Sequence, residues 1–345
     1  MVKERLYRIE VVPRCLTFKR PAGTSRGVYT TRKLWEVRIR KEDEPSVIGI
    51  GECAPLPDLS CDYGVDYEIT LSKACLDLEQ KGYVDTESLR HYPSILFGLE
   101  TAMRHYEQGG WRHYDTPFSQ GQAGIPINGL IWMGDYKYML EQVEEKMKEG
   151  FRCVKLKIGA IDFDRELSLL KHIRAHFSAK EIELRVDANG AFTPSEAMDK
   201  LKRLPEQPIR AGQLEEMARL AAESPLPIAL DEELIGCNAP DEKRRLLETI
   251  HPQYIILKPS LHGGIAGCTE WVHLAETILG STPEQPKWWV TSALESQIGL
   301  NAIAQWCATL GNPLPQGLGT GEIFKDDKHK LIQRKGDTIW FTNDL

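Results

Sequence analysis

Short hydrophobic runs separated by longer mixed segments dominate the chain from residue 125 onwards. Each run has the length of a β-strand, and most are followed by a segment with apolar residues at helical spacing. Alternation of strands and helices is typical of a parallel sheet, and seven or eight such units close it into a barrel. The expected barrel strands are residues 126–131, 152–157, 182–187, 211–215, 227–231, 254–258 and 288–292.

The first part of the chain follows a different pattern, which predicts an α+β domain. Its alternating apolar positions predict strands at residues 7–13, 35–41 and 46–51. Its helical spacings predict helices at residues 66–81 and 93–108, followed by a polar connection at 109–122. After residue 321 the strand and helix rhythm stops, and residues 330–341 are expected to form an extended pair that returns to this N-terminal domain.

Charged residues close most of the predicted barrel strands. The strand at residues 152–157 carries Lys155 and Lys157, and later strands end in Asp187, Glu215, Asp231 and Lys258. Successive strands of a parallel β/α barrel end at the same rim, where catalytic groups gather. A single acid at a strand end usually caps the next helix. Three acids in consecutive units, with lysines before and after them, favour a functional site instead.

The two lysines of residues 152–157 are two positions apart. Because side chains of a strand alternate between its faces, Lys155 and Lys157 are expected to point the same way. A second ammonium group nearby disfavours protonation and lowers the pKa of a lysine, which makes it a usable base near neutral pH. The alternative is an edge strand with two solvated lysines, and the strand-end acids weigh against it.

The three acids suit a hard metal ion. Carboxylates without histidine or thiolate partners are typical ligands of Mg²⁺, and Mn²⁺ accepts the same oxygens. The predicted ligands are Asp187, Glu215 and Asp231. Each of the last two is followed by a second glutamate, and alternation allows only one residue of each pair to face the barrel interior.

In these residues the chain resembles the enolase superfamily and, within it, the o-succinylbenzoate synthases of menaquinone biosynthesis. The Lys-x-Lys pair, Asp-x-Asn, Glu-Glu, Asp-Glu and Lys-Pro follow the family's order. Supporting matches lie at residues 51–57, 126–132, 292–296 and 317–321. The resemblance implies a modified (β/α)8-type barrel, of (β/α)7β form, at residues 125–321. It also implies a capping domain at 1–124, completed by about 322–345, whose loops 21–27 and 56–60 cover the barrel mouth, the first as a mobile flap.

The resemblance also implies the chemistry. Lys157 would remove the proton α to a carboxylate and return it to the departing hydroxide, with Lys155 beside it and Lys258 opposite. A Mg²⁺ ion would stabilise the enediolate, as is general for this superfamily. The reaction would be dehydration of 2-succinyl-6-hydroxy-2,4-cyclohexadiene-1-carboxylate to 2-succinylbenzoate. Weaker candidates for orienting the substrate are Arg185, Asn189, Ser260, Ser292 and Glu295.

Two rival functions remain at this point. Racemisation of an N-succinylamino acid or epimerisation of a dipeptide needs the same metal and two opposed lysines, which Lys157 and Lys258 would supply. The region 291–299 offers only Glu295 as an acid for a dipeptide amine, which disfavours the epimerase. A non-catalytic barrel that binds a carboxylate is the remote alternative, since binding alone does not require a base.

Composition agrees with this class of protein, for which the resemblance implies a small carboxylate substrate. The 345 residues exceed one compact domain and suit a barrel with a smaller module. A net charge of −7 with interspersed signs disfavours nucleic acid as a partner. Neither a secretion signal nor an apolar membrane span is evident, and the eight scattered cysteines suit reduced thiols, so a cytoplasmic location is expected. The sequence leaves the oligomeric state open.

Overall fold

The structure is a computed structural model of the whole chain. It describes residues 5–24, 27–132, 134–158, 162–178, 180–188, 190–201 and 209–342. The chain begins with an antiparallel sheet in the order β1-β2-β3, whose strands are β1 (Arg8–Thr24), β2 (Gly27–Arg40) and β3 (Gly49–Cys53). Three helices follow: α1 (Tyr67–Lys81), α2 (Thr86–Leu89) and α3 (Pro93–Gln108).

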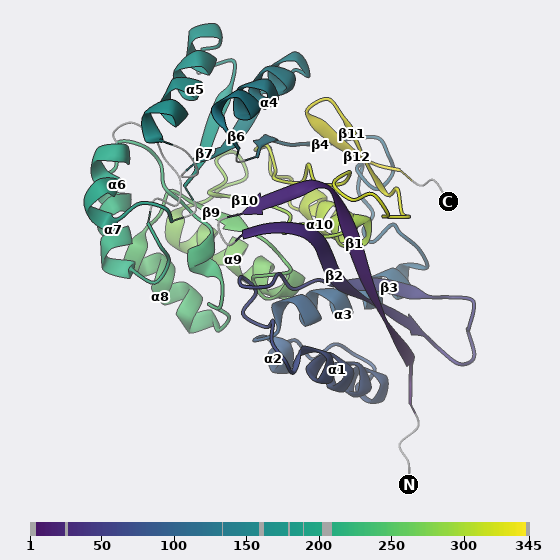
Figure 1. Ribbon diagram of the computed structural model, residues 1–345. Coiled ribbons are helices and arrows are strands. Elements are labelled where there is room, and N and C mark those ends of the chain that lie inside the picture. The colour runs from purple at the N-terminus through teal and green to yellow at the C-terminus, as the bar shows by residue number, and fades with distance from the viewer. Residues whose placement is uncertain are drawn as a thin grey trace.

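Helix α3 packs closely on the first sheet because two glycines of β3 carry no side chain. A Cβ atom at Gly51 would lie 2.0 Å from the carbonyl oxygen of Gly98, and one at Gly49 would lie 2.2 Å from that of Ala102. The predicted helices 66–81 and 93–108 are confirmed to within one residue. The predicted flap 21–27 is wrong as a loop, because its described residues belong to the ends of β1 and β2, which form one long hairpin (Figure 1).

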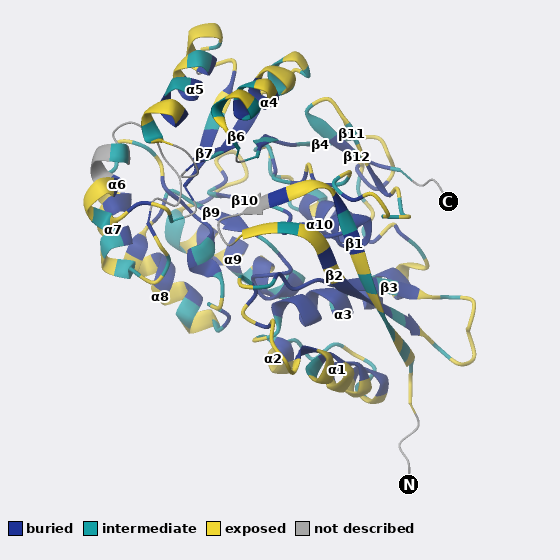
Figure 2. Cartoon of the chain, viewed as in Figure 1, coloured by how far each residue is buried: buried dark blue, intermediate teal, exposed yellow. Residues whose placement is uncertain are grey.

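Two groups of parallel strands form the second half of the chain. One group contains β5 (Gly129–Ile131), β6 (Cys153–Lys157) and β7 (Glu183–Asp187), and the other contains β8 (Ala229–Leu230), β9 (Tyr254–Leu257) and β10 (Trp288–Val290). Residues 316 and 317 join the groups, because Gly317 pairs in parallel with Thr291 and Gln316 pairs in parallel with Ile127. Helices lie outside these strands, with their buried faces inward (Figures 1 and 2). They are α4 (Tyr136–Lys148), α5 (Phe163–His176), α6 (Pro194–Leu201), α7 (Leu214–Glu223), α8 (Pro240–Ile250), α9 (Gly264–Leu279) and α10 (Gln297–Thr309).

The predicted strand at residues 211–215 is wrong. Helix α7 begins at Leu214, so the Glu-Glu pair lies in its first turn. The helix buries Met217, Leu220 and Ala221, whose spacing of three and four residues is helical. Burial of this apolar helix face stabilises a helix here, whereas the short run at 211–215 had predicted a strand.

The C-terminal segment forms the predicted strand pair, but with a different partner from the one expected. Strands β11 (Ile332–Lys335) and β12 (Thr338–Phe341) are antiparallel, and β12 pairs with β4 (Ile125–Pro126) instead of the first sheet. The return to the first sheet occurs just before, where Lys19 N donates to Ile323 O (2.8 Å) and Lys325 N donates to Thr17 O (2.9 Å). The domain boundaries at 124 and 321 stay a prediction.

Candidate active site

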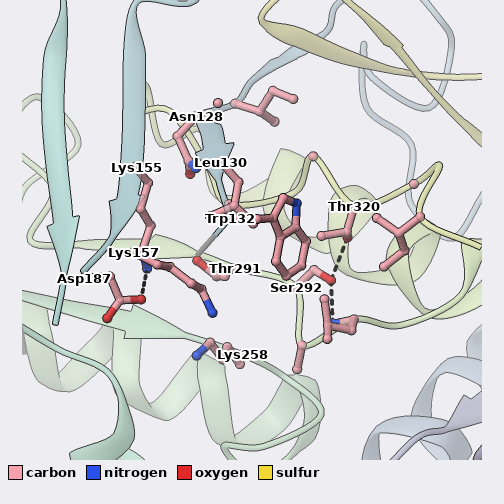
Figure 3. A pocket seen from close by; sticks show the side chains of 18 of the residues that line it. Asn128, Leu130, Trp132, Lys155, Lys157, Asp187, Lys258, Thr291, Ser292 and Thr320 are labelled. Carbon is pink, nitrogen blue, oxygen red and sulfur yellow. Dashed lines mark hydrogen bonds and ion pairs between the residues drawn. The ribbon is translucent and has the colours of Figure 1, made fainter. Parts of the chain in front are cut away.

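A cavity of about 290 Å³ is lined by residues of the barrel and by residues of the N-terminal sheet and helices (residues 5–108, called the first domain below). Figure 3 shows part of its lining. Leu56 and Leu59 of the first domain line it, together with Trp132 after β5 and Leu294 after β10. It also contains charged residues that lie in the barrel strands or directly after them. These are Lys155, Lys157, Asp187, Asp231, Glu232 and Lys258.

Strands β6 and β7 bring the first three of these charges together. Both Lys155 and Lys157 line the cavity, as the alternation of a strand requires, and Lys157 is paired in register with Asp187. Lys155 is buried, and its Nζ lies 3.0 Å from Asp187 Oδ2. Burial alone would raise the pKa of Asp187, but the charges of Lys155 and Lys157 outweigh it and lower that pKa to about 2. Asp187 is therefore an ionised carboxylate at neutral pH.

Lys157 has the environment of a base. Burial is the largest cause that lowers its pKa, and the positive charges of Lys155 and Lys258 lower it further against the opposing effect of Asp187 and Glu232. From the sequence, the lowered pKa was expected to come from the charge of Lys155. In the structure, burial of Lys157 contributes more to it than Lys155 does. The Nζ atom of Lys157 lies 5.8 Å from the ring centre of Trp132, and its amino group points into the cavity (Figure 3).

A second ion pair lies across the cavity. Asp231 follows β8 and is 2% exposed, and Lys258 follows β9. The Nζ atom of Lys258 lies 2.5 Å and 2.7 Å from the two carboxylate oxygens of Asp231. The cavity thus holds two aspartates, each ion-paired with a lysine. Lys157 is acted on by the charges of Asp187, Lys155 and Lys258.

Three of the weaker candidates form one hydrogen-bond network behind the cavity wall. Glu295 accepts hydrogen bonds from Ser260 Oγ (2.5 Å), Ser292 Oγ (2.8 Å) and Ala293 N (2.7 Å). Thr320 Oγ1 donates to Ser292 Oγ at 2.8 Å. Of these three candidates, Ser292 lines the cavity. Glu295 binds Ser292 from behind the wall and is itself bound by Ser260.

The structure separates two other candidates from the cavity. Arg185 is buried, but its guanidinium lies 4.1 Å from the ring of Trp289 and donates to Glu183 and to the carbonyl of Pro315. It occupies the middle of β7, two residues before Asp187, which ends the strand. Glu215 is exposed on α7 and does not line the cavity, so its basis as a strand-end ligand is lost. Asn189 lies outside the described residues.

The third predicted metal ligand therefore needs another residue. Within the described part of the chain, no three His, Cys, Asp or Glu side chains are arranged to hold a metal ion. Since α7 begins at Leu214, an acid at the end of the preceding barrel strand would have to come earlier in the sequence. Glu206 is the one acidic residue in the sequence between Leu201 and Leu214, and it lies outside the described residues. Glu232, the second glutamate that follows Asp231, lines the cavity itself.

Sequence reasoning missed the apolar side of the cavity. Trp132, Leu261, Leu294 and Ile323 all line it. The signal for Trp132 was present, because it directly follows a barrel strand just as the charged residues do. The position of Ile323 could be found only from the chain's return to β1.

Comparisons with known proteins agree with this architecture. The sequence matches the family described as Enolase C-terminal domain-like over residues 138–333. The o-succinylbenzoate synthase of Desulfotalea psychrophila is 43% identical over 352 residues, which cover 90% of this chain and 93% of that protein. The crystal structure of MenC from Desulfotalea psychrophila LSv54 superimposes with a TM-score of 0.79 and 36% identity, covering 97% of this chain and 99% of that chain.

A more distant structure shares the fold. The L-Ala-D/L-Glu epimerase of Bacillus subtilis, solved in a substrate-liganded complex, superimposes with a TM-score of 0.79 at 21% identity, covering 98% of this chain and 96% of that one. The predicted barrel of modified (β/α)8 type is confirmed by these superpositions. No described helix has the length and apolar character needed to cross a membrane. The family match and the 43% identity over nearly the whole chain show that the chain belongs to the enolase superfamily and, within it, to the o-succinylbenzoate synthase family.

Proposed function

We propose that this chain dehydrates 2-succinyl-6-hydroxy-2,4-cyclohexadiene-1-carboxylate to 2-succinylbenzoate. The observation that carries the proposal is Lys157, a lysine of lowered pKa in a cavity that also holds Asp187, Asp231 and the lysines Lys155 and Lys258. The 43% identity to an o-succinylbenzoate synthase over 90% of the chain supports this substrate over others of the superfamily.

Asp187 and Asp231 fit a hard divalent cation. Both carboxylates are buried, both line the same cavity, and oxygen is the ligand atom that Mg²⁺ and Mn²⁺ prefer. Each is ion-paired with a lysine, which shows that the cavity accommodates positive charge beside both. When bound there, Mg²⁺ supplies Lewis-acid stabilisation of negative charge on the substrate carboxylate. Sequence position makes Glu206 the candidate for the third ligand, with Glu232 as the alternative inside the cavity.

Lys157 performs the proton transfers. Its neutral Nζ takes the proton from the carbon α to the carboxylate, and the electron pair of that bond becomes part of the new ring double bond. The ammonium then returns a proton to the hydroxyl group as its C–O bond breaks, so one water leaves and the base is regenerated. Burial and the two flanking lysines favour the neutral amine that the first step requires.

The other lysines bind and orient. Lys155, held by Asp187, keeps a positive charge beside the base and toward the substrate carboxylate. Lys258 is held by Asp231, which follows the preceding strand β8, and presents its ammonium to the ring that becomes aromatic. A cation over an aromatic face contributes about 0.5–2 kcal/mol, and this contribution grows as the ring aromatises.

Apolar residues keep water away from the reacting carbon. Leu56 and Leu59 reach over the cavity from the first domain, and Trp132 and Leu294 complete the cover. Exclusion of water strengthens every charge interaction inside the site.

The test is conversion of the cyclohexadiene carboxylate by purified protein, followed in the ultraviolet with Mg²⁺ and then with chelator. The proposal expects rapid, metal-dependent aromatisation that Lys157→Ala abolishes, while Lys171→Ala on the exposed face of α5 leaves it unchanged. Absence of turnover in protein that binds Mg²⁺ would refute the dehydration. Racemisation of N-succinylamino acids, measured as hydrogen exchange in deuterated water, would then be the function that Lys157 and Lys258 serve.

A further inference from the structure

We infer that Arg32, a residue of the first domain outside the cavity, is a positioning residue that sets substrate affinity by holding the apolar wall of the cavity in place. The wall consists of Leu56, Ala293 and Leu294, which line the cavity from two different domains. The inference rests on the proposed dehydration for its kinetic test, and it concerns a residue that touches no reacting atom.

Arg32 binds both halves of this wall with one planar group. Its Nη1 and Nη2 atoms donate to the carbonyl oxygens of Pro55 and Ala54 in the first domain. On the barrel side, its Nε donates to Leu294 O at 3.1 Å and its Nη2 donates to Ala293 O at 3.4 Å. Arg32 is 2% exposed, so these four carbonyl oxygens accept the hydrogen bonds that water would accept from an exposed guanidinium. A fork of fixed geometry joins the two backbones in one relative position.

Two buried carboxylates complete the arrangement around the segment that follows β10. Glu295 binds Ser292 Oγ and Ala293 N, while Glu52 of β3 accepts from Ser296 N (3.0 Å), Ser296 Oγ and Gly299 N (3.1 Å). Both carboxylates act electrostatically on Arg32, and both are almost fully buried. The single positive charge of Arg32 therefore offsets part of the negative charge of these two acids beneath the cavity wall.

The backbone of Leu294 explains why the wall needs support. Its φ is 64°, in the left-handed region that branched side chains rarely adopt. Its carbonyl is held by Arg32 and its N–H donates to Ser292 Oγ at 3.0 Å. This conformation turns the Leu294 side chain into the cavity. Release of the carbonyl would let the residue relax toward an unstrained conformation, and the wall would lose the shape that contacts the substrate.

Substitution of Arg32 is expected to affect binding more than chemistry. Lys157, Asp187 and Asp231 lie on other strands and do not contact Arg32, so the reacting groups stay in place. Arg32→Lys keeps the charge between Glu52 and Glu295 but lacks the fork that reaches four carbonyls. We expect this variant to raise KM about tenfold while kcat falls less than about threefold, the pattern of lost uniform binding.

The matched control is Lys243→Met. Lys243 is also fully buried and charge-paired, with Glu270 at 2.7 Å, but it joins α8 to α9 and does not line the cavity. Lys243→Met is expected to lower thermal stability without changing KM in the folded protein. Arg32→Met, which removes both charge and hydrogen bonds, is expected to lower stability and to raise KM at least as much as Arg32→Lys.

The experiment measures kcat, KM and the affinity for 2-succinylbenzoate in wild type, Arg32→Lys and Lys243→Met, each at a temperature where thermal melts show it folded. A rise in KM and a parallel loss of product affinity in Arg32→Lys, absent in Lys243→Met, supports the inference. Unchanged KM and product affinity in Arg32→Lys overturn it. Failure of the proposed dehydration is distinguishable, because wild type itself would then show no turnover while product affinity still reports on Arg32.

Discussion

Removal of the Asp187 charge offers a quantitative test of the electrostatics of the site. Asp187→Asn keeps the shape of the side chain but leaves Lys155, 3.0 Å away, without its carboxylate. In the folded protein the pKa of Asp187 falls from its ordinary 3.8 to about 2. At about 1.36 kcal/mol per tenfold change in acid strength, the ionised form contributes about 2 kcal/mol to folding at neutral pH. Burial of both groups protects this contribution from screening by salt.

Because the folded pKa is depressed, this stability is present above pH 3.8 and is lost as the pH falls through about 2. The assay is urea denaturation in chelator at pH 7 and at pH 3, with Asp77→Asn as the control for an exposed acid 3.5 Å from Lys81. Asp187→Asn should lose about 2 kcal/mol at pH 7 and less at pH 3, whereas Asp77→Asn should change little. An unchanged midpoint for Asp187→Asn at pH 7 would refute the pairing.

Three further outcomes are expected. Lys157→Ala should lower kcat by at least about 10²–10⁴-fold, which is the usual contribution of a general base. The thermal melt and Mg²⁺ binding should stay nearly unchanged, and substantial residual turnover would contradict the role of Lys157 as the base. Burial raises the pKa of Glu100 to about 7, so stability falls as the pH rises from about 4.5 to 7; Glu100→Gln should flatten this dependence in melts at pH 5 and 8, and a parallel pH profile in the variant would rule the cause out. In calorimetric Mg²⁺ titrations, Glu206→Gln should weaken binding more than tenfold and Glu215→Gln should not, and the reverse result would restore the original ligand.

The first domain contributes to the site through backbone position more than through chemical groups. It places Leu56 and Leu59 over the cavity and supplies Arg32 and Glu52 beneath the wall. The reacting groups all come from the barrel. This division means that substitutions in the first domain should change affinity and substrate choice, while substitutions at the strand ends should change rate.

Local pattern in the sequence was enough for most of the architecture. The helices at 66–81 and 93–108 and the strands around Lys155, Asp187 and Lys258 follow from apolar spacing, which depends only on neighbouring residues. The shared direction of Lys155 and Lys157 follows from the alternation of a strand. Their meeting with Asp187, Asp231 and Lys258 follows from the rule that parallel strands end at one rim. These residues all line one cavity, as that reasoning predicted.

The tertiary structure decided everything that depends on distant segments. The acidic pair at Glu215 could be read as a strand end or a helix start, and only the packing of Met217 and Leu220 selected the helix. Arg185 obeys the same alternation as Asp187, yet the contact with Trp289 places it away from the substrate cavity. The lowered pKa of Lys157 comes first from burial, which no neighbouring residue in the sequence reveals. Burial, the partner of a charge and the shape of the cavity wall are properties of groups far apart in the chain, so they exist only once the chain has folded.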